Sequence, residues 1–361
     1  MVRVAEEGFD RGALSDGEFG ELALRLFRIQ ARMNLCYRRF LEASECRVEA
    51  LTRWEEIPCV PAAAFKELDV TSLPLADRKH VFRSSGTTQR DRGRHYHSDL
   101  SLALYEQSLL DWFQWHLVSS EGESSTLALA SLTPPASAVP ESSLVHMFDV
   151  VAKRGGYSET EFFGTLSESG GWEVAMERLI AFLRRRISLE QPVGLVGTAF
   201  NFVQLLDFMG ERGLQFKLPE GSCLLETGGY KGRTRALSKA ELYGALCQSL
   251  GVSQSQIICE YGMSELSSQA YDLRMGVDLG AKTRRLFRYA PWARVRLVSP
   301  ETGEEVPSGQ SGLIQVFDLA NVWSVMAVQT EDLGVKEGDG FELLGRSQEA
   351  SAKGCSLLPE M

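Results

Sequence analysis

The chain has 361 residues, of which 44% are hydrophobic and 24% charged, so it holds enough apolar material for one large or two moderate hydrophobic cores. Thirty-eight Lys and Arg against 48 Asp and Glu give a formal net charge of −10, which leaves no overall positive field to hold nucleic acid or an anionic membrane. Any anionic ligand must therefore be bound by local groups.

Cysteine usage and the chain ends indicate a reducing, cytoplasmic location. The seven cysteines are scattered and no two form a CxxC pair, so we expect neither a disulfide nor a zinc framework. Residues 1–19 mix acids and glycines without an apolar core, which predicts no signal or transit peptide. The most apolar late stretch, 313–328, is interrupted by polar residues, so we expect no membrane span.

The N-terminal part is expected to be helical. Ser15 and Glu18 form a candidate capping box, and apolar residues recur every three or four positions over 19–40, which predicts one long amphipathic helix. A short apolar stretch at 80–82 leads into a polar loop over 83–93, and a second helix is predicted to start near Ser98.

From there the chain alternates short apolar runs with longer helical patterns, which predicts an α/β fold with mainly parallel sheets covered by helices. The predicted strands lie at 126–132, 193–196, 223–225 and 257–259, and the helices at 142–153, 172–187, 200–210 and 239–250. After residue 261, predicted strands at 293–298 and 312–319 are separated by turn-rich sequence, which indicates a smaller β-rich subdomain.

The loop segment 84–88 reads Ser-Ser-Gly-Thr-Thr and is a candidate phosphate cradle. Small hydroxyl residues around a glycine let backbone N–H and side-chain O–H groups converge on phosphate oxygens. The spacing excludes a Walker-type P-loop, and the basic residues that follow over 90–95 favour anion binding. A polar surface turn is the alternative, because Ser, Gly and Thr are common loop residues.

A second candidate segment, 260–265, reads Glu-Tyr-Gly-Met-Ser-Glu and follows a predicted buried strand. In open parallel sheets, ligands bind beyond the carboxyl ends of the strands. Tyr261 offers an aromatic face to a nucleobase, Ser264 a hydroxyl, and Glu265 a carboxylate suited to Mg²⁺. Taken in isolation, the six residues are better explained as a strand end followed by a hydrogen-bonded polar turn.

Together the two segments resemble the signature motifs of the adenylate-forming superfamily of acyl-CoA synthetases, luciferase-like enzymes and adenylation domains. Its phosphate loop resembles 84–88, with Gln89 in place of a final glycine, and its Tyr-Gly-Met-Thr-Glu motif resembles 261–265, with Ser264 in place of threonine. Further motifs resemble those of the LuxE-type acyl-protein synthetases within this superfamily. These are Thr-Gly-Gly-Tyr-Lys at 227–231, Thr-Glu-Asp-Leu-Gly at 330–334, Gly-Arg at 345–346 and Lys-Gly-Cys-Ser-Leu at 353–357.

The resemblance implies an AMP-forming acid–thiol ligase that activates a carboxylic acid, with a fatty acid expected, to an acyl-adenylate. ATP and Mg²⁺ are the implied cofactors, with Glu265 as the metal ligand. The nucleotide-binding residues that it implies are Ser84, Ser85, Gly86, Thr87, Thr88, Gly228, Gly229, Tyr261, Gly262, Ser264 and Asp332. Lys231 and Arg346 are implied contacts of the reacting phosphate or carboxylate, and Cys355 is the implied acyl acceptor.

The resemblance also implies an organisation into four regions. These are an N-terminal helical region at 1–57, an α/β nucleotide-binding core at 58–260, a β-rich subdomain at 261–346 and a short C-terminal tail at 347–361. The full-size C-terminal domain of most superfamily members, with its catalytic lysine, is expected to be absent. Lys353, the arginines after Thr88 or a partner protein are the candidates to supply that cation.

An acceptor protein, a reductase or coenzyme A is an implied partner, and two other functions stay open. The chain could be a coenzyme A ligase of the phenylacetate type. It could also be a non-catalytic nucleotide-binding scaffold, which the departures Gln89 and Glu331 favour. The sequence does not encode the identity of the acid, because apolar pocket walls follow no residue code.

Overall fold

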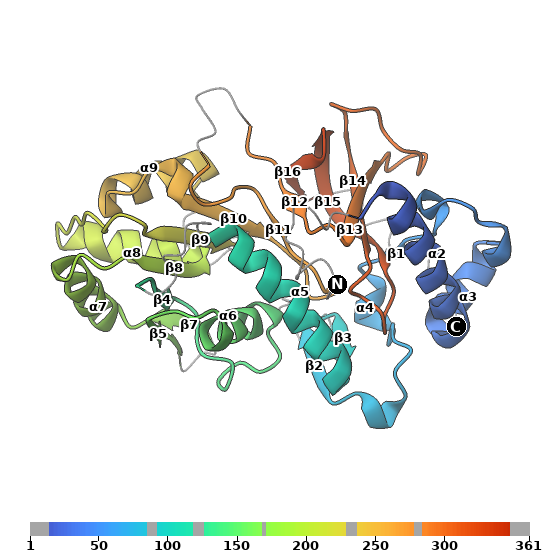
Figure 1. Ribbon diagram of the computed structural model, residues 1–361, viewed down its shortest axis with the longest axis horizontal. Helices are drawn as coiled ribbons and strands as arrows, with labels where there is room; N and C mark the ends of the chain where they lie inside the picture. The colour runs from blue at the N-terminus through green and yellow to red at the C-terminus, as the bar shows by residue number, and fades with distance from the viewer. Residues whose placement is uncertain are drawn as a thin grey trace.

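Two β-sheets organise the protein in the computed structural model, which describes residues 14–84, 92–117, 126–167, 171–228, 237–277 and 284–346. A seven-stranded sheet with its helices fills one end of the elongated molecule (Figure 1). A five-stranded sheet and the N-terminal helices fill the other end. This α/β architecture confirms the predicted fold class.

The seven-stranded sheet has the order β12-β11-β10-β9-β8-β4-β5. Its strands are β4 Ala128–Ser131, β5 Glu159–Phe162, β8 Val193–Thr198, β9 Cys223–Thr227, β10 Ile257–Tyr261, β11 Ala270–Tyr271 and β12 Arg288–Tyr289. The five strands from β5 to β10 run parallel, and β11 and β12 add an antiparallel edge. The predicted mainly parallel sheet is therefore confirmed.

Helices cover both faces of this sheet. One apolar cluster joins it to α7 Met176–Ser188, α8 Ala199–Glu211 and α9 Lys239–Leu250, and a second joins it to α5 Asp99–Leu117 and α6 Ser143–Arg154. The prediction of a helix over 172–187 was wrong in its first residues. Trp172–Val174 forms β7, which pairs with β6 Gly164–Leu166, so the helix begins only after this hairpin.

The five-stranded sheet combines late strands with one early strand. It contains β1 Val60–Pro61, β13 Ala293–Val298, β14 Ser311–Asp318, β15 Ala327–Glu337 and β16 Gly340–Arg346. β1 pairs in parallel with β15, while β13 to β16 pair antiparallel in chain order. The region boundaries expected after residues 57, 260 and 346 stay a prediction. The two sheets do not coincide with these regions, because β1, from the expected core, pairs in the five-stranded sheet. Likewise, β11 and β12, from the expected β-rich subdomain, pair in the seven-stranded sheet.

The single long N-terminal helix was a wrong prediction, because the chain forms α2 Asp16–Met33 and α3 Leu35–Ala43. The break lies at Asn34, which is fully buried and has an extended backbone. Its side-chain oxygen accepts a hydrogen bond from the Tyr37 amide at 3.2 Å and caps α3, while its amide nitrogen donates to the Ser324 carbonyl at 3.3 Å. A tertiary contact therefore ends a helix that the apolar periodicity would continue.

The remaining elements of the described chain are short. They are the helices α4 Ala64–Glu67, η1 Val48–Ala50, η2 Trp54–Glu56, η3 Leu75–Asp77 and η5 Gln254–Gln256, and the strands β2 His80–Arg83 and β3 Arg94–His97. β2 and β3 form an antiparallel hairpin. The cysteines in the described part of the chain are all free thiols, and none of its helices is long and apolar enough to cross a membrane.

Gln30 attaches α2 to the loop between β14 and β15. This side chain is 1% exposed, and its amide nitrogen donates to the carbonyls of Asn321 at 2.8 Å and Val322 at 2.9 Å. Its oxygen accepts from the Met326 amide at 2.9 Å. One glutamine thus satisfies three backbone groups that have little access to water.

We expect Gln30→Leu to lower the free energy of unfolding by about 2 to 4 kcal/mol, because buried backbone groups would lose their partners. Urea unfolding followed by fluorescence would measure the change. Glu42→Gln, an exposed position on α3, is the matched control and should leave the midpoint unchanged. An equally stable Gln30→Leu protein would contradict this role of the glutamine.

Candidate functional site

The hairpin β2–β3 carries the predicted phosphate loop. Only Ser84 of the segment 84–88 lies within the described residues; Ser85, Gly86, Thr87 and Thr88 lie outside them. The Ser84 amide donates to the Gly93 carbonyl at 3.0 Å, and the Gly93 amide donates to Ser84 Oγ at 2.7 Å. Arg92 Nε also donates to the Ser84 carbonyl at 2.9 Å. These hydrogen bonds close the base of the loop.

Glu265 lies against this base. A Cβ atom added at Gly93 would come within 2.8 Å of Glu265 Oε1 and 3.1 Å of Ser84 Oγ, so only a glycine fits there without displacing its neighbours. The two predicted motifs, far apart in the sequence, therefore meet. Sequence reasoning missed Gly93, whose requirement depends on a contact with the later motif.

A buried histidine holds the second motif to the hairpin. His95 Nδ1 lies 2.8 Å from the Ser264 carbonyl, and its ring centroid is 4.3 Å from that of His97. Burial lowers the pKa of His95 to about 4, so the ring is neutral near pH 7 and its Nδ1–H donates to the carbonyl. Both histidines are 2% exposed and act in packing.

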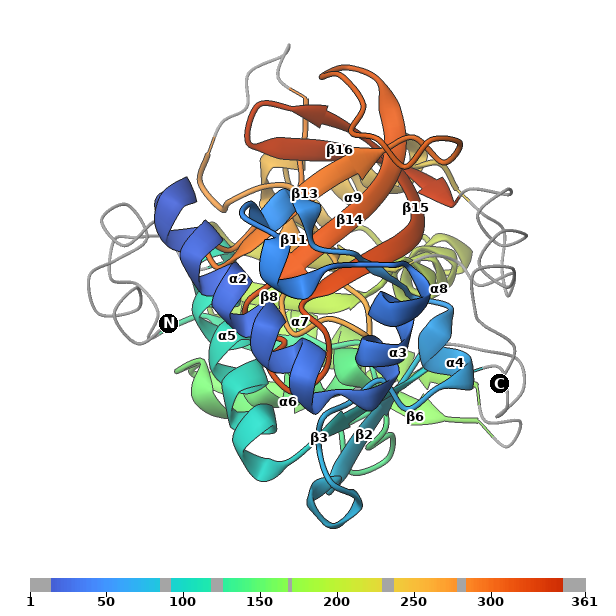
Figure 2. The same cartoon turned by 90° about the vertical axis from the view of Figure 1, so that its right-hand side faces the viewer.

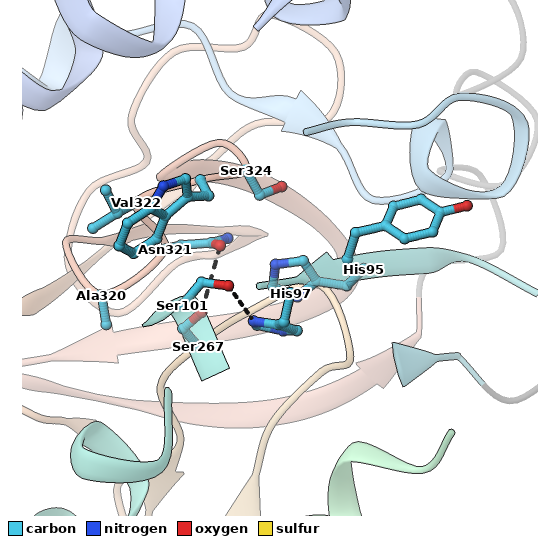
Figure 3. Close-up of a pocket in the computed structure, with 10 residues that line it drawn as sticks. His95, His97, Ser101, Ser267, Ala320, Asn321, Val322 and Ser324 are labelled. Atoms are coloured by element: carbon cyan, nitrogen blue, oxygen red, sulfur yellow. Dashed lines mark hydrogen bonds between the residues drawn. The ribbon is translucent and has the colours of Figure 1, made fainter. Parts of the chain in front are cut away.

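A small polar pocket lies behind this contact (Figure 3). His97, Ser101 and Ser267 line it together with the loop 320–324. The Ser101 hydroxyl lies 3.3 Å from His97 Nδ1, and Asn321 Nδ2 donates to the Glu265 carbonyl at 2.9 Å. The loop between β14 and β15 therefore supports the backbone of Glu265.

Tyr261 joins the two sheets at the same place. Its hydroxyl donates to Asp332 Oδ2 at 2.9 Å, across from β10 to β15. Its ring packs against Phe287 and Phe341, with centroid distances of 5.9 and 5.7 Å. Arg346 Nε lies 3.8 Å from Asp332 Oδ1, and the arginine side chain is 77% exposed. The structure thus brings three of the predicted site residues together.

The surroundings of Glu265 suit a carboxylate that acts as a ligand of a cation. Burial, with a smaller contribution from Glu331, raises the pKa of its carboxyl to about 7, although a hydrogen bond from its own backbone amide and the charges of Lys66 and Arg346 act to lower it. No described lysine or arginine forms an ion pair with it, and no three potential metal ligands cluster within the described residues. Mg²⁺ often uses one or two carboxylates and takes its remaining ligands from phosphates and water, so a lone carboxylate fits this ion.

A second buried carboxyl, Glu260, was not predicted to have a role. Its Oε2 accepts a hydrogen bond from the Thr227 hydroxyl, which connects the carboxyl ends of β9 and β10. Burial raises its pKa to about 7 although this hydrogen bond acts in the opposite direction. A Cβ at Gly262 would lie 2.3 Å from its Oε1, which explains the glycine there. The sequence signal that could have pointed to Glu260 is a glutamate at the end of an apolar strand.

The remaining predicted residues lie at or beyond the edges of the described segments. Gly228 follows β9 with a φ of +69°, a left-handed conformation that favours glycine. Gly229, Lys231 and Cys355 lie outside the described residues. Their roles stay predictions.

Comparison with known proteins gives one family and several relatives. The profile of the family described as "Acyl-protein synthetase, LuxE" matches residues 19–360. A long-chain-fatty-acid–luciferin-component ligase of Vibrio harveyi is 26% identical over 194 residues, which are 51% of this chain and 49% of the relative. The ligase of the same name from Aliivibrio fischeri is 22% identical over 320 residues, covering 84% and 78%. The match thus spans about half the length of the first relative.

Solved structures share the fold. A 2-hydroxyisobutyryl-CoA ligase in complex with 2-HIB-AMP and CoA superposes with a TM-score of 0.67 at 14% identity, covering 92% of this chain and 69% of that one. ATP-bound MatB from Rhodopseudomonas palustris gives a TM-score of 0.50 at 17% identity, covering 74% and 47%. At these identities the likeness establishes the adenylate-forming fold alone.

Glu260 should make stability depend on pH. Its folded pKa of about 7 lies above the ordinary 4.5, so its stabilising contribution is complete below pH 4.5 and is lost as the pH rises through 7. We expect Glu260→Gln, which can still accept from Thr227, to reduce the loss of unfolding free energy between pH 5 and 8 by up to about 3 kcal/mol.

Urea unfolding at each pH would measure this difference. Glu173→Gln, an exposed position on β7, is the control and should keep the wild-type pH dependence. If Glu260→Gln shows the same pH dependence as the wild type, the buried carboxyl is not the titrating group.

Proposed function

Because this chain belongs to the LuxE family of acyl-protein synthetases, we propose that it uses ATP to convert a carboxylic acid into an acyl-adenylate. The acyl group then passes to a thiol. The observation that carries the proposal is the meeting of Ser84 and Gly93, at the base of the phosphate loop, with Glu265. The names of the two bacterial relatives support a long-chain fatty acid as the substrate.

In the proposed first step, the substrate carboxylate attacks the α-phosphate of ATP and pyrophosphate leaves. Such a step needs positioning of the reactants and neutralisation of the charge that develops on the phosphates. Ser84, Ser85, Thr87 and Thr88 would hold the β- and γ-phosphates through hydroxyl groups, and Gly86 would let their backbone approach.

Glu265 is the proposed ligand of Mg²⁺, which when bound supplies positive charge to the phosphate oxygens. The chain's own part is to hold this carboxylate in place. His95 fixes the neighbouring Ser264 carbonyl, and Asn321 fixes the carbonyl of Glu265 itself. Both contacts are made by buried side chains, so the backbone that carries the carboxylate is held rigidly.

The nucleoside would lie on the other side of the motif. Asp332 is the proposed ligand of the ribose hydroxyls, and Tyr261, which donates to one of its oxygens, orients it. Gly228, Gly229 and Gly262 would leave room for the adenine. Arg346, exposed and 3.8 Å from Asp332, has the reach to contact the reacting phosphate or carboxylate, and Lys231 shares this proposed role.

In the proposed second step, the Cys355 thiolate attacks the acyl carbonyl, a thioester forms, and the bond to AMP breaks. AMP leaves with the electron pair. The acyl group then passes to an acceptor protein, a reductase or coenzyme A. A reducing cytoplasm would keep this thiol available.

We expect carboxylate-dependent exchange of labelled pyrophosphate into ATP, the reverse of the proposed first step. Glu265→Gln removes the negative metal ligand, and Asp332→Asn weakens the ribose contact. Each should slow the exchange by about ten-fold or more, because a charge-assisted contact of about 1.5–3 kcal/mol is lost.

The control is Glu337→Gln, an exposed carboxyl at the end of β15, which should exchange at the wild-type rate. Protein that binds ATP but exchanges with no acid from a panel of fatty, aromatic and amino acids would refute the synthetase and favour a non-catalytic scaffold. Wild-type exchange by both variants would refute the two assigned roles only.

Cys355→Ser should still form acyl-adenylate but lose the covalent label that wild-type protein acquires from labelled acid and ATP. A thioester survives acid and is released by neutral hydroxylamine, so these two treatments identify it. Cys247→Ser, a half-buried cysteine of α9, is the control that should keep the label. Label retained by Cys355→Ser, or direct transfer to free coenzyme A without protein labelling, would contradict the carrier role and favour a coenzyme A ligase.

A further inference from the structure

The outer face of α2 presents a row of apolar side chains to solvent. Leu22, Ile29 and Met33 are 41, 49 and 65% exposed, and the half-buried Leu26 continues the row. Their spacing of four, three and four residues places them on one stripe of the helix. The adjoining side of the helix, about a quarter of a turn away, buries Phe19, Ala23, Phe27, Gln30 and Ala31. The helix therefore carries one wide apolar arc, of which the part at Leu22, Ile29 and Met33 stays exposed while Leu26, at its inner edge, also contacts the core.

The charges of the same helix are segregated along its length. Its first half carries Asp16, Glu18 and Glu21, and its second half carries Arg25, Arg28 and Arg32. The helix dipole favours this order only within the first and last turns, so it does not account for Glu21 and Arg25 or for the apolar row. Neither Glu21 nor Arg32 forms an ion pair with another described residue.

We infer that α2 is a self-association surface, on which a second copy of this chain packs its own α2 antiparallel about a twofold axis. In this arrangement Leu22 faces Met33 of the second copy and Leu26 faces its Ile29. The acidic half of each helix then lies along the arginine half of the other, with Glu21 within one turn of Arg32 of the second copy. A parallel arrangement would place like charges together. The charge order therefore selects an antiparallel pair of identical chains.

The position of α2 permits this contact. Figure 2 shows the helix crossing the front of the molecule, with no other described element drawn over it. Leu35, at the start of α3, is 48% exposed as well. A stable interface buries about 800 Å² on each partner, and one helix face of 18 residues supplies less than that. The dimer is accordingly weak and its population depends on protein concentration.

Sedimentation velocity of the full chain, from about 1 to 100 µM, tests the inference. The wild type should shift from monomer to dimer over this range. Ile29→Ser combined with Met33→Ser should weaken association by at least about ten-fold, while Leu75→Ser should not change it. Leu75 is the matched control because it is 80% exposed and lies on η3, away from α2. Pyrophosphate exchange by each variant verifies that it is folded.

A charge swap tests the antiparallel arrangement separately. Glu21→Arg and Arg32→Glu should each weaken the dimer, and the protein with both changes should regain wild-type association. A chain that stays monomeric over the whole range overturns the inference, as does a dimer that the serine variants leave intact. Capture of a different protein on this face by a monomeric chain would overturn it as well.

Discussion

The candidate site depends on the junction between the two sheets. A hydrogen bond from the Tyr261 hydroxyl to Asp332 spans this junction. Tyr261 ends β10 of the seven-stranded sheet, and Asp332 belongs to β15 of the five-stranded sheet. The Ser267 amide donates to Asp318, at the end of β14, and so adds a second connection. Neither sheet alone carries both the carboxylate proposed for the metal and the one proposed for the ribose. The proposed chemistry therefore depends on the relative position of the two sheets.

This junction contains three buried carboxyl groups that differ in the hydrogen bonds and charges that compensate their burial. Burial raises the pKa of Asp318 to about 6, and of Glu260 and Glu265 to about 7. Asp318 accepts hydrogen bonds from the Ser268 hydroxyl and from the backbone amides of Ser267 and Ala320. Lys66 and Arg346 help Glu265 only at longer range. Besides a hydrogen bond from its own backbone amide, no described lysine or arginine forms an ion pair with Glu265, and burying a carboxylate with so few partners costs stability. It is this carboxyl that lies beside the predicted phosphate loop.

The sequence predicted elements well where local signals and tertiary packing agree. Helix α9 has the predicted bounds, because the capping box of Ser238 starts it and Gly251, in a left-handed conformation, ends it. The break at Asn34 could not be predicted, since the apolar period continues through it and only the contact with Ser324 reveals the cause. Both motifs of the candidate site were recognisable, but the roles of Gly93 and Glu260 depend on neighbours that only the fold brings close.

The balance of charge around Glu265 bears on the form in which a nucleotide binds. Glu331 and Glu265 repel each other, and Glu331 also repels Asp332, so the site is already acidic before a triphosphate arrives. Arg346 counters this locally, but its side chain is 77% exposed and therefore well screened by water. A free triphosphate would add negative charge beside these carboxylates, whereas a nucleotide that carries its own divalent cation would bring positive charge to Glu265. In the proposed function, this acidity would disfavour the metal-free nucleotide and favour its complex with a divalent cation.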